Sequence, residues 1–243
     1  MIVLLTDFGE SEYVGVMKGV IYSLCPTEQI VDLTHTIPPQ SIREGAWVLL
    51  NSYNSFPRGT VFVCVVDPGV GTGRDPVLVK TKNYTFIGPD NGLLYPATAS
   101  DGVESISTII IDEDASNTFH GRDVFAPAAA YFIRNQSGKV LGGFKQSLGV
   151  SLKFNQNERK GEVVRIDRFG NIITNIPPAD KIQYLLATSD LRWNVQWYPT
   201  YFLGPDRGIF IVTGSYGTLE IAVKHGDARE EVPFKIGDEL SLE

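Results

Sequence analysis

Short runs of apolar, largely β-branched residues alternate with longer helical segments over the first 150 residues of the chain. This alternation is typical of βαβ units, in which helices cover both faces of a mainly parallel sheet. Between residues 13 and 24, for example, Val14, Met17, Ile21 and Leu24 recur at the spacing of one helical face. We therefore predict strands at 2–5, 29–33, 61–66, 77–81, 85–87 and 108–111, and helices at 13–24, 42–53 and 124–134.

The last predicted helix carries a start signal. Asp123 is a suitable N-cap, because its side chain can accept a hydrogen bond from a free N–H of the first turn. Pro127 falls in that first turn, where a missing N–H costs little. We predict that this helix begins directly after Asp123.

The pattern changes after Ser151–Gly161, a polar segment without periodicity that we interpret as a linker. Beyond it, turns rich in Gly, Pro and Asp separate short apolar runs, which is typical of a small antiparallel barrel or sandwich. The sequence thus predicts an α/β N-terminal domain with a mainly parallel sheet at 1–152, and a small all-β, barrel-like C-terminal domain at 162–243. The strands expected in the second domain are 163–166, 171–175, 209–213, 218–223 and 238–242.

Composition narrows the class of protein and of partner. The 243 residues are 43% hydrophobic, and 21 basic against 28 acidic residues give a net charge of −7, which excludes a disordered or collagen-like chain. The acidic balance and the lack of a run of five basic residues argue against nucleic acid or an anionic membrane as partner. The longest uncharged apolar stretch, residues 125–133, is far shorter than the roughly 18 residues that span a bilayer.

The two cysteines, Cys25 and Cys64, each stand beside apolar residues, which predicts buried thiols rather than a disulfide or a metal pair. No basic leader precedes the strand predicted at 2–5. We therefore expect a non-secreted protein of the reducing cytoplasm.

A carboxylate follows the first predicted strand, in the segment Thr6-Asp7-Phe8-Gly9. Parallel sheets bind ligands beyond the carboxyl ends of their strands, where Asp7 would accept hydrogen bonds from two vicinal hydroxyls of a ribose. A turn-forming aspartate beside a glycine is the alternative interpretation of the same residues.

The third predicted strand ends in a glycine-rich segment, Asp67-Pro68-Gly69-Val70-Gly71-Thr72-Gly73-Arg74. It has neither the Gly-Lys-Ser/Thr ending of a phosphate-binding P-loop nor the spacing of a dinucleotide fingerprint. Instead, Asp67 and Arg74 supply a carboxylate and a guanidinium from one loop. They form either a plain surface ion pair or a joint site for a small polar reactant.

A histidine, His120, stands in Thr118-Phe119-His120-Gly121-Arg122-Asp123, directly before a predicted helix. Backbone N–H groups at the positive helix end would lie beside it. The chain has three histidines, and no two are spaced as HxxxH, so we expect no metal centre.

Two turns of the second predicted domain carry binding chemistry. In the segment 167–171, Phe169 can stack on a purine while Asn171 pairs with its donor and acceptor edge; a hairpin turn is the alternative. The turn at 213–217 would offer the Ser215 hydroxyl and backbone N–H groups to a carboxylate.

In their order along the chain, these motifs resemble those of the S-adenosylmethionine (SAM) hydroxide adenosyltransferases, relatives of the fluorinase and the chlorinase. Gly88-Pro89-Asp90-Asn91-Gly92 and Thr174-Asn175-Ile176 add to the likeness, which runs from about residue 2 to the last strand. The resemblance implies an N-terminal α/β domain, a C-terminal β-barrel and a homotrimer with SAM bound between neighbouring subunits. The implied reaction is SAM plus water giving adenosine and L-methionine, with SAM as substrate and no cofactor.

The resemblance also implies roles for single residues. Asp67, Arg74 and His120 match the family's water-activating trio, and the halogenases differ at the aspartate and histidine positions, which favours water over a halide as nucleophile. Asp7 matches the ribose-binding aspartate. The other matches are Phe169, Asn171 and the stacking partner Tyr201 at the adenine, and Asp167 and Ser215 at the amino and carboxylate ends of the methionine.

Two positions depart from the halogenase pattern: Glu12 replaces an aspartate that contacts substrate, and Gln40 replaces a tryptophan that lines the pocket. Their roles stay open, as does the choice of formal base between Asp67 and His120, which can titrate as one unit. Three other classes compete with a SAM hydrolase: a non-catalytic SAM- or adenosine-binding module, a SAM-dependent halogenase, and a metal-dependent hydrolase built on aspartates.

Overall fold

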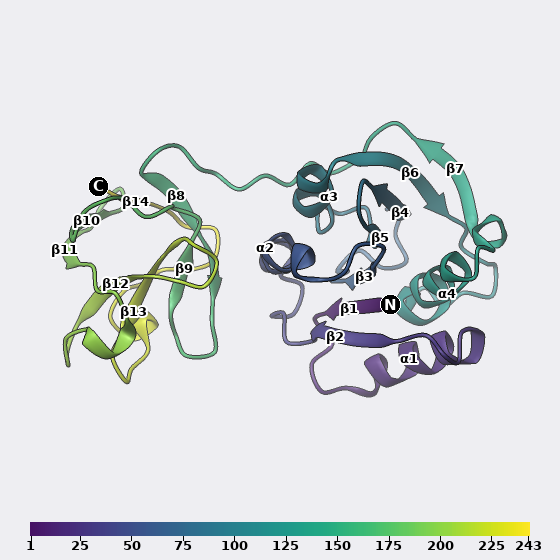
Figure 1. Ribbon diagram of the computed structural model, residues 1–243, viewed down its shortest axis with the longest axis horizontal. Helices are drawn as coiled ribbons and strands as arrows, with labels where there is room; N and C mark the ends of the chain where they lie inside the picture. Colours follow the sequence, from purple (N-terminus) through teal and green to yellow (C-terminus); the bar gives the residue numbers. More distant parts are fainter. The chain divides into compact units, whose positions relative to one another are not determined.

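The computed structural model describes residues 1–243, which divide into two compact units, Met1–Leu152 and Lys153–Glu243. The first unit combines helices with a sheet, and the second consists of strands, loops and short 3₁₀ turns without an α-helix (Figure 1). Each unit has a hydrophobic core of its own.

A seven-stranded sheet forms the centre of the first unit. Its strands are β1 (Ile2–Thr6), β2 (Ile30–Thr34), β3 (Val61–Val65), β4 (Pro76–Thr81), β5 (Thr85–Pro89), β6 (Val103–Ile109) and β7 (Leu141–Lys145). They lie in the order β2-β1-β3-β5-β4-β6-β7, in which β2, β1, β3 and β5 are parallel neighbours and the remaining pairs are antiparallel. The predicted α/β class is confirmed, with the parallel strands at one side of a mixed sheet.

Four α-helices accompany this sheet: α1 (Glu12–Leu24), α2 (Ile42–Ser52), α3 (Tyr95–Asp101) and α4 (Ala126–Ile133). Helix α1 packs against α4, and α2 packs against α3. All five residues of β1 are buried, as expected of a strand that is covered on both faces. Short 3₁₀ turns follow at Tyr53–Ser55 and Ser137–Lys139.

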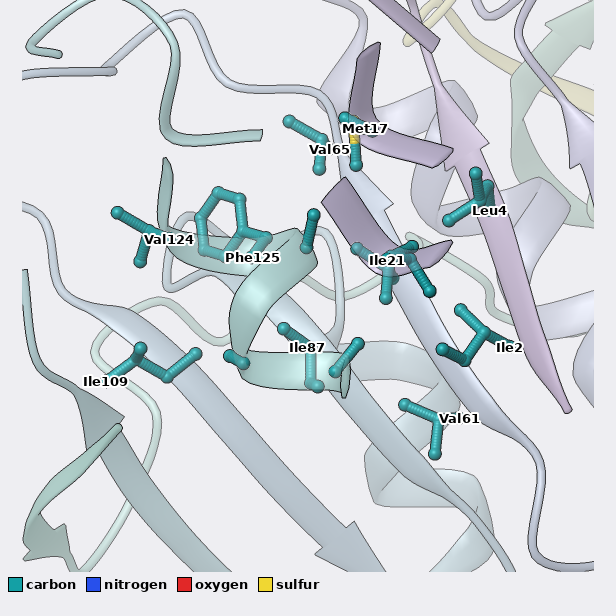
Figure 2. Packing of buried hydrophobic residues seen from close by; sticks show 14 of the residues in the cluster. Ile2, Leu4, Met17, Ile21, Val61, Val65, Ile87, Ile109, Val124 and Phe125 are labelled. Atoms are coloured by element: carbon teal, nitrogen blue, oxygen red, sulfur yellow. The ribbon is translucent and has the colours of Figure 1, made fainter. Parts of the chain in front are cut away.

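The core between strands and helices is apolar throughout. Figure 2 shows Ile2 and Leu4 of β1 with Met17 and Ile21 of α1 and with Phe125, all members of one buried cluster. Each fully buried side chain of this size contributes about 1.5–3 kcal/mol relative to an exposed one. This packing holds the loops at the strand ends in fixed positions.

The predicted helix start after Asp123 is wrong. A π-helical turn, Gly121–Phe125, leads directly into α4, and Asp123 lies inside that turn. Its carboxylate accepts a hydrogen bond from the N–H of Ser116 at 2.9 Å and pairs with the guanidinium of Arg122 at 2.6 Å. Asp123 therefore fastens the preceding loop instead of capping a helix, whereas Pro127 does lie in the first turn of α4.

Other elements were misplaced or missed. The strand predicted at 108–111 is β6, which begins at Val103 and ends at Ile109. Four elements were not predicted. α3 is short, and the two glycines of β7 weaken any strand pattern. The other two, β10 (Gln183–Ala187) and β11 (Arg192–Gln196), lie in the second unit, and in β11 polar residues interrupt the apolar run.

The second unit is an antiparallel, nearly closed barrel, as predicted for an all-β C-terminal domain. Its other strands are β8 (Lys160–Ile166), β9 (Ile172–Thr174), β12 (Ile209–Thr213), β13 (Leu219–Val223) and β14 (Glu239–Leu242). The order is β11-β10-β14-β8-β9-β13-β12. The N–H of Tyr198 donates to the carbonyl of Ile211 at 2.8 Å, so the chain after β11 reaches β12 and brings the two edges together.

Two 3₁₀ turns, Tyr201–Leu203 and Ala228–Glu230, complete the second unit. In neither unit does a helix have the length and the apolar character that crossing a membrane requires.

Candidate active site

Two parallel strands bring Asp7 and Asp67 to one edge of the first sheet. Thr6 at the end of β1 lies opposite Val65 at the end of β3, and the aspartates follow these strand ends. Parallel sheets bind ligands at this edge. Both aspartates line one cavity of about 630 Å³ within the first unit.

Asp67, Arg74 and His120 form a continuous hydrogen-bonded chain. Nε of Arg74 donates to one carboxylate oxygen of Asp67 at 3.0 Å, and Nη2 of Arg74 donates to the other oxygen. The same Nη2 donates to Nδ1 of His120 at 2.8 Å. The structure therefore brings together the three residues that the sequence placed in two separate motifs.

The three side chains are shielded from solvent. Asp67 and Arg74 have side chains that are 5% and 9% exposed, and His120 as a residue is 2% exposed. The guanidinium carbon of Arg74 lies 5.5 Å from the ring centroid of Phe125, at a distance where a cation is attracted to an aromatic face. The surface ion pair that was the alternative interpretation is thereby excluded.

The contact with Arg74 determines which nitrogen of His120 carries hydrogen. A guanidinium only donates, so Nδ1 of the imidazole is the acceptor, and Nε2 carries the hydrogen in the neutral ring. Burial and the charge of Arg74 lower the pKa of His120, which favours that neutral ring. The buried Nε2 of His120 and Nη1 of Arg74 have no hydrogen-bond partner in the chain. Two N–H groups are thus left to donate to a bound molecule.

A glycine allows the Asp67 and His120 loops to meet. Gly71 adopts φ +75°, and a Cβ at this position would lie 2.3 Å from the carbonyl oxygen of Asn117. A side chain there would force the two loops apart. The close approach of residues 67–74 to residues 116–120 therefore requires glycine at position 71.

Asp7 is held by a strained backbone segment. One of its carboxylate oxygens accepts the N–H of Gln40 at 2.8 Å, and Gln40 adopts φ +66°, a conformation that costs a non-glycine residue energy. This contact fixes the carboxylate and leaves its other oxygen for a ligand. Gln40 itself lines the cavity, whereas Glu12 is exposed in the first turn of α1.

Three aromatic rings form one wall of the cavity. Phe8, Tyr13 and Phe119 pack edge to face, with ring centroids 5.0–6.1 Å apart. Tyr13 is close to half exposed, so this wall is open to solvent. The cavity thus combines an apolar side with Asp7, Asp67 and His120, and Arg74 lies behind the last two, hydrogen-bonded to both.

In the second unit, Asp167 and Asn171 hold each other in place. Oδ1 of Asp167 accepts the backbone N–H groups of Phe169 at 2.8 Å and Asn171 at 2.9 Å, and Oδ2 accepts the side-chain amide of Asn171 at 2.9 Å. The carbonyl oxygen of that amide remains as an acceptor. Phe169 is 66% exposed; the guanidinium carbon of Arg168 lies over its ring, 5.1 Å from the centroid, which leaves the other face open to a ligand.

Tyr201 and Ser215 belong to two other segments of the same unit. The hydroxyl of Tyr201 donates to a carboxylate oxygen of Glu220 at 2.7 Å. Ser215 is exposed in the tight turn between β12 and β13, which a hydrogen bond from the N–H of Gly217 to the carbonyl of Gly214 closes at 3.0 Å. This unit also has a hollow of about 610 Å³, which other residues line, among them Lys160, Arg192 and Glu239.

Comparison with known proteins decides the family. Residues 2–142 match the model of the SAM hydroxide adenosyltransferase N-terminal domain, and residues 161–241 match that of the C-terminal domain. The chain belongs to the SAM hydroxide adenosyltransferase family.

Named relatives align over most of the chain. An (R)-S-adenosyl-L-methionine hydrolase of Thermus thermophilus is 35% identical over 98% of this chain and 97% of its own. A hydrolase of the same name from Methanocaldococcus jannaschii is 42% identical over 72% of this chain and 66% of its own. A fluorinase of an Actinoplanes species is more distant, with 27% identity over 74% of this chain and 72% of its own. The crystal structure of an uncharacterized conserved protein from Thermotoga maritima covers both chains fully, with a TM-score of 0.90 and 35% identity.

Sequence reasoning missed some residues of the site. It gave no role to the aromatic wall or to Glu220, although an acid within the apolar strand Leu-Glu-Ile-Ala-Val was a signal for the latter. The turn Gly88–Gly92 is structural: Asn91 donates to the carbonyl of Val66 at 2.9 Å, and Asp90 binds Lys145 at 2.7 Å. The chain has no group of three or more His, Cys, Asp or Glu side chains placed to hold a metal ion.

Proposed function

We propose that this chain hydrolyses SAM to adenosine and L-methionine. The observation that carries the proposal is the buried chain of Asp67, Arg74 and His120 beside a cavity that Asp7 also lines. Family membership and the names of the SAM hydrolases among its relatives support it.

The reaction is a substitution at C5′ of the ribose. The oxygen of water forms a bond to C5′, the C5′–S bond breaks, and its electron pair passes to sulfur. The sulfonium thereby becomes the neutral thioether of methionine, and the attacking water loses one proton. Because the leaving group is neutral, no general acid is needed, and catalysis acts on the water.

Full ionisation of the water before attack is out of reach for these groups. Lowering the pKa of water from about 15.7 to about 7 would take roughly 12 kcal/mol at 1.36 kcal/mol per unit. A single guanidinium, already paired with Asp67, does not supply this amount. The proton therefore leaves during or after formation of the C–O bond, when the oxygen has become strongly acidic.

The hydrogen-bond pattern suggests separate roles for the trio. Nε2–H of His120 and Nη1–H of Arg74 donate to the attacking oxygen, holding it in line with the C–S bond and stabilising its charge. His120 in this form has no free site for a proton, so Asp67 is the acceptor. A carboxylate is a weak base, which is sufficient for a late proton transfer.

The remaining predicted residues bind the substrate. The free oxygen of Asp7 accepts the ribose hydroxyls, while Phe169 and Tyr201 stack on the adenine and Asn171 accepts from its amino group. Asp167 and Ser215 bind the amino and carboxylate ends of the methionine. Four hydrolases among the relatives are named for the (R) epimer, so we propose (R)-SAM as the preferred epimer.

Incubation of each SAM epimer with the pure protein, followed by chromatography of the products, tests the function. We expect adenosine and methionine in equal amounts, and no 5′-halo-5′-deoxyadenosine at high chloride or fluoride. Asp67→Asn and His120→Ala should lower turnover far more than SAM affinity. Lys18→Met, which breaks an exposed ion pair with Asp32 in the same unit, is the matched control and should keep full activity. SAM that is bound but left intact would indicate a binding module instead.

The assembly and the compartment are part of the proposal. We infer a homotrimer, which sedimentation of the pure protein tests, and a loss of activity on dilution would accompany its dissociation. We infer a cytoplasmic enzyme, because Cys25 and Cys64 are both free and buried thiols, which suits a reducing compartment.

A further inference from the structure

Glu220 is a buried carboxyl group on the outer face of the barrel. Its neighbours Leu219 and Ile221 belong to the barrel core, so Glu220 points to the opposite side of β13. There it shares an apolar surface with Val212 and Ala222 and is 3% exposed. A carboxyl group is costly to bury in such surroundings unless its oxygens are engaged.

Both oxygens of Glu220 are closely surrounded. Oε2 accepts the hydroxyl of Tyr201 at 2.7 Å. Oε1 lies against Gly214, where a Cβ would come within 1.6 Å of it. Gly214, in the turn that carries Ser215, thus leaves room for one oxygen of the carboxyl group, and the hydroxyl of Tyr201 binds the other.

The anchored ring of Tyr201 keeps an open side. Its hydroxyl end is fixed by Glu220, yet the residue as a whole remains 45% exposed. The charge of Asp167 acts on both Tyr201 and Glu220, so the pair lies near the loop that bears Phe169 and Asn171. Burial and Glu220 raise the pKa of the Tyr201 phenol, which therefore remains a hydrogen-bond donor.

We propose that Glu220 is a positioning residue for substrate binding: it holds the ring of Tyr201 in the orientation that presents an aromatic face to the adenine. This inference rests on the proposed function. Without the hydrogen bond, the half-exposed ring is free to rotate, and the binding of the nucleoside has to order it again. The reacting atoms are unaffected, because Glu220 acts on the substrate only through Tyr201.

A double-mutant cycle on SAM hydrolysis tests the coupling. We expect Tyr201→Phe and Glu220→Ala each to raise KM for SAM about tenfold and to change kcat by no more than about twofold. A tenfold change corresponds to the loss of one hydrogen bond to a charged group. The double variant should also show about a tenfold effect rather than a hundredfold one. Glu239→Gln, an exposed glutamate on β14, is the control and should match the wild type.

A second readout is independent of activity. In Glu220→Gln, an isostere that keeps the fold, the pKa of Tyr201 followed by NMR of ¹³C-labelled tyrosine should fall toward the ordinary value of about 10. An unchanged titration of Tyr201, or additive effects on KM, would overturn the role of Glu220. A wild-type protein that leaves SAM intact would overturn the proposed function and this role with it, whereas normal turnover with additive effects overturns the role alone.

Discussion

Nη2 of Arg74 lies 2.8 Å from Nδ1 of His120, so a permanent cation donates a hydrogen bond to a histidine that has to be neutral to accept it. Burial and the Arg74 charge both lower the pKa of this histidine. The hydrogen bond between Arg74 and His120 therefore forms only while the His120 ring is neutral.

This dependence predicts how activity and stability respond to acid. Turnover should fall only as the pH approaches the lowered pKa of His120, which lies below the ordinary histidine value of about 6.5, because a protonated His120 cannot accept from Arg74. The unfolded chain takes up this proton at a higher pH than the folded one. His120 therefore makes stability fall as the pH falls from about 6.5 to its lower folded pKa.

Profiles of kcat and of the free energy of unfolding against pH, for the wild type and for His120→Asn, measure these effects. In His120→Asn the free energy of unfolding should fall less with decreasing pH, because the variant lacks the titrating ring. A His120 resonance that titrates at or above pH 6.5 would contradict the assignment of the ring as a neutral acceptor.

Arg74→Met should destabilise the protein, because it leaves the charge of Asp67 buried without its partner. We expect the free energy of unfolding at pH 7 to fall by about 3–5 kcal/mol, measured by denaturant titration. The double variant Asp67→Asn with Arg74→Met should recover most of this loss, since neither residue then carries a buried charge. Losses that simply add would show that the pair is not coupled.

Gly71→Ala should disturb both stability and activity. The left-handed backbone and the contact with Asn117 predict a loss of at least about 1–2 kcal/mol in the free energy of unfolding. Turnover should fall as well, because Asp67 moves relative to His120. Gly73→Ala in the same loop is the matched control: nothing lies within 4 Å of its Cβ, and a change of no more than about 0.5 kcal/mol is expected. Equal effects of the two substitutions would contradict this account of the loop.

Phe169→Ala should weaken substrate binding without affecting the fold. Stacking of a base on an aromatic side chain is worth about 1–3 kcal/mol, which corresponds to a rise in KM of about 5- to 150-fold. Phe202→Ala is the control and should leave KM unchanged: Phe202 is 78% exposed and, like Phe169, has a cationic side chain, that of Lys224, over its ring. Kinetics on both variants, with melting temperatures alongside, distinguish stacking from a general surface effect.

Hydrophobic periodicity located the long elements of the fold because their burial is regular. The strand at residues 2–5 and the helix at 13–24 appear in the structure as β1 and α1 with ends shifted by one residue. The π-helical turn before α4 left no such signal. It depends on a hydrogen bond from the N–H of Ala126 to the carbonyl of Gly121, five residues earlier, and this is a local geometry that apolar spacing does not encode.

The site was predictable only in part for a related reason. Asp7 and Asp67 could be predicted at one edge of the sheet, because each follows the end of a strand and parallel strands end at the same edge. The hydrogen bond from Arg74 to His120 depends instead on the contact of Gly71 with Asn117, which joins loops distant in sequence. Glu220 was not predicted because it is a single polar residue within an otherwise apolar strand.

Hydrolysis of SAM in H₂¹⁸O, with mass spectrometry of both products, tests the central claim most directly. The account predicts one ¹⁸O atom in adenosine, at C5′, and none in methionine. Adenosine without the label, or a label found in methionine, would contradict attack of water on C5′.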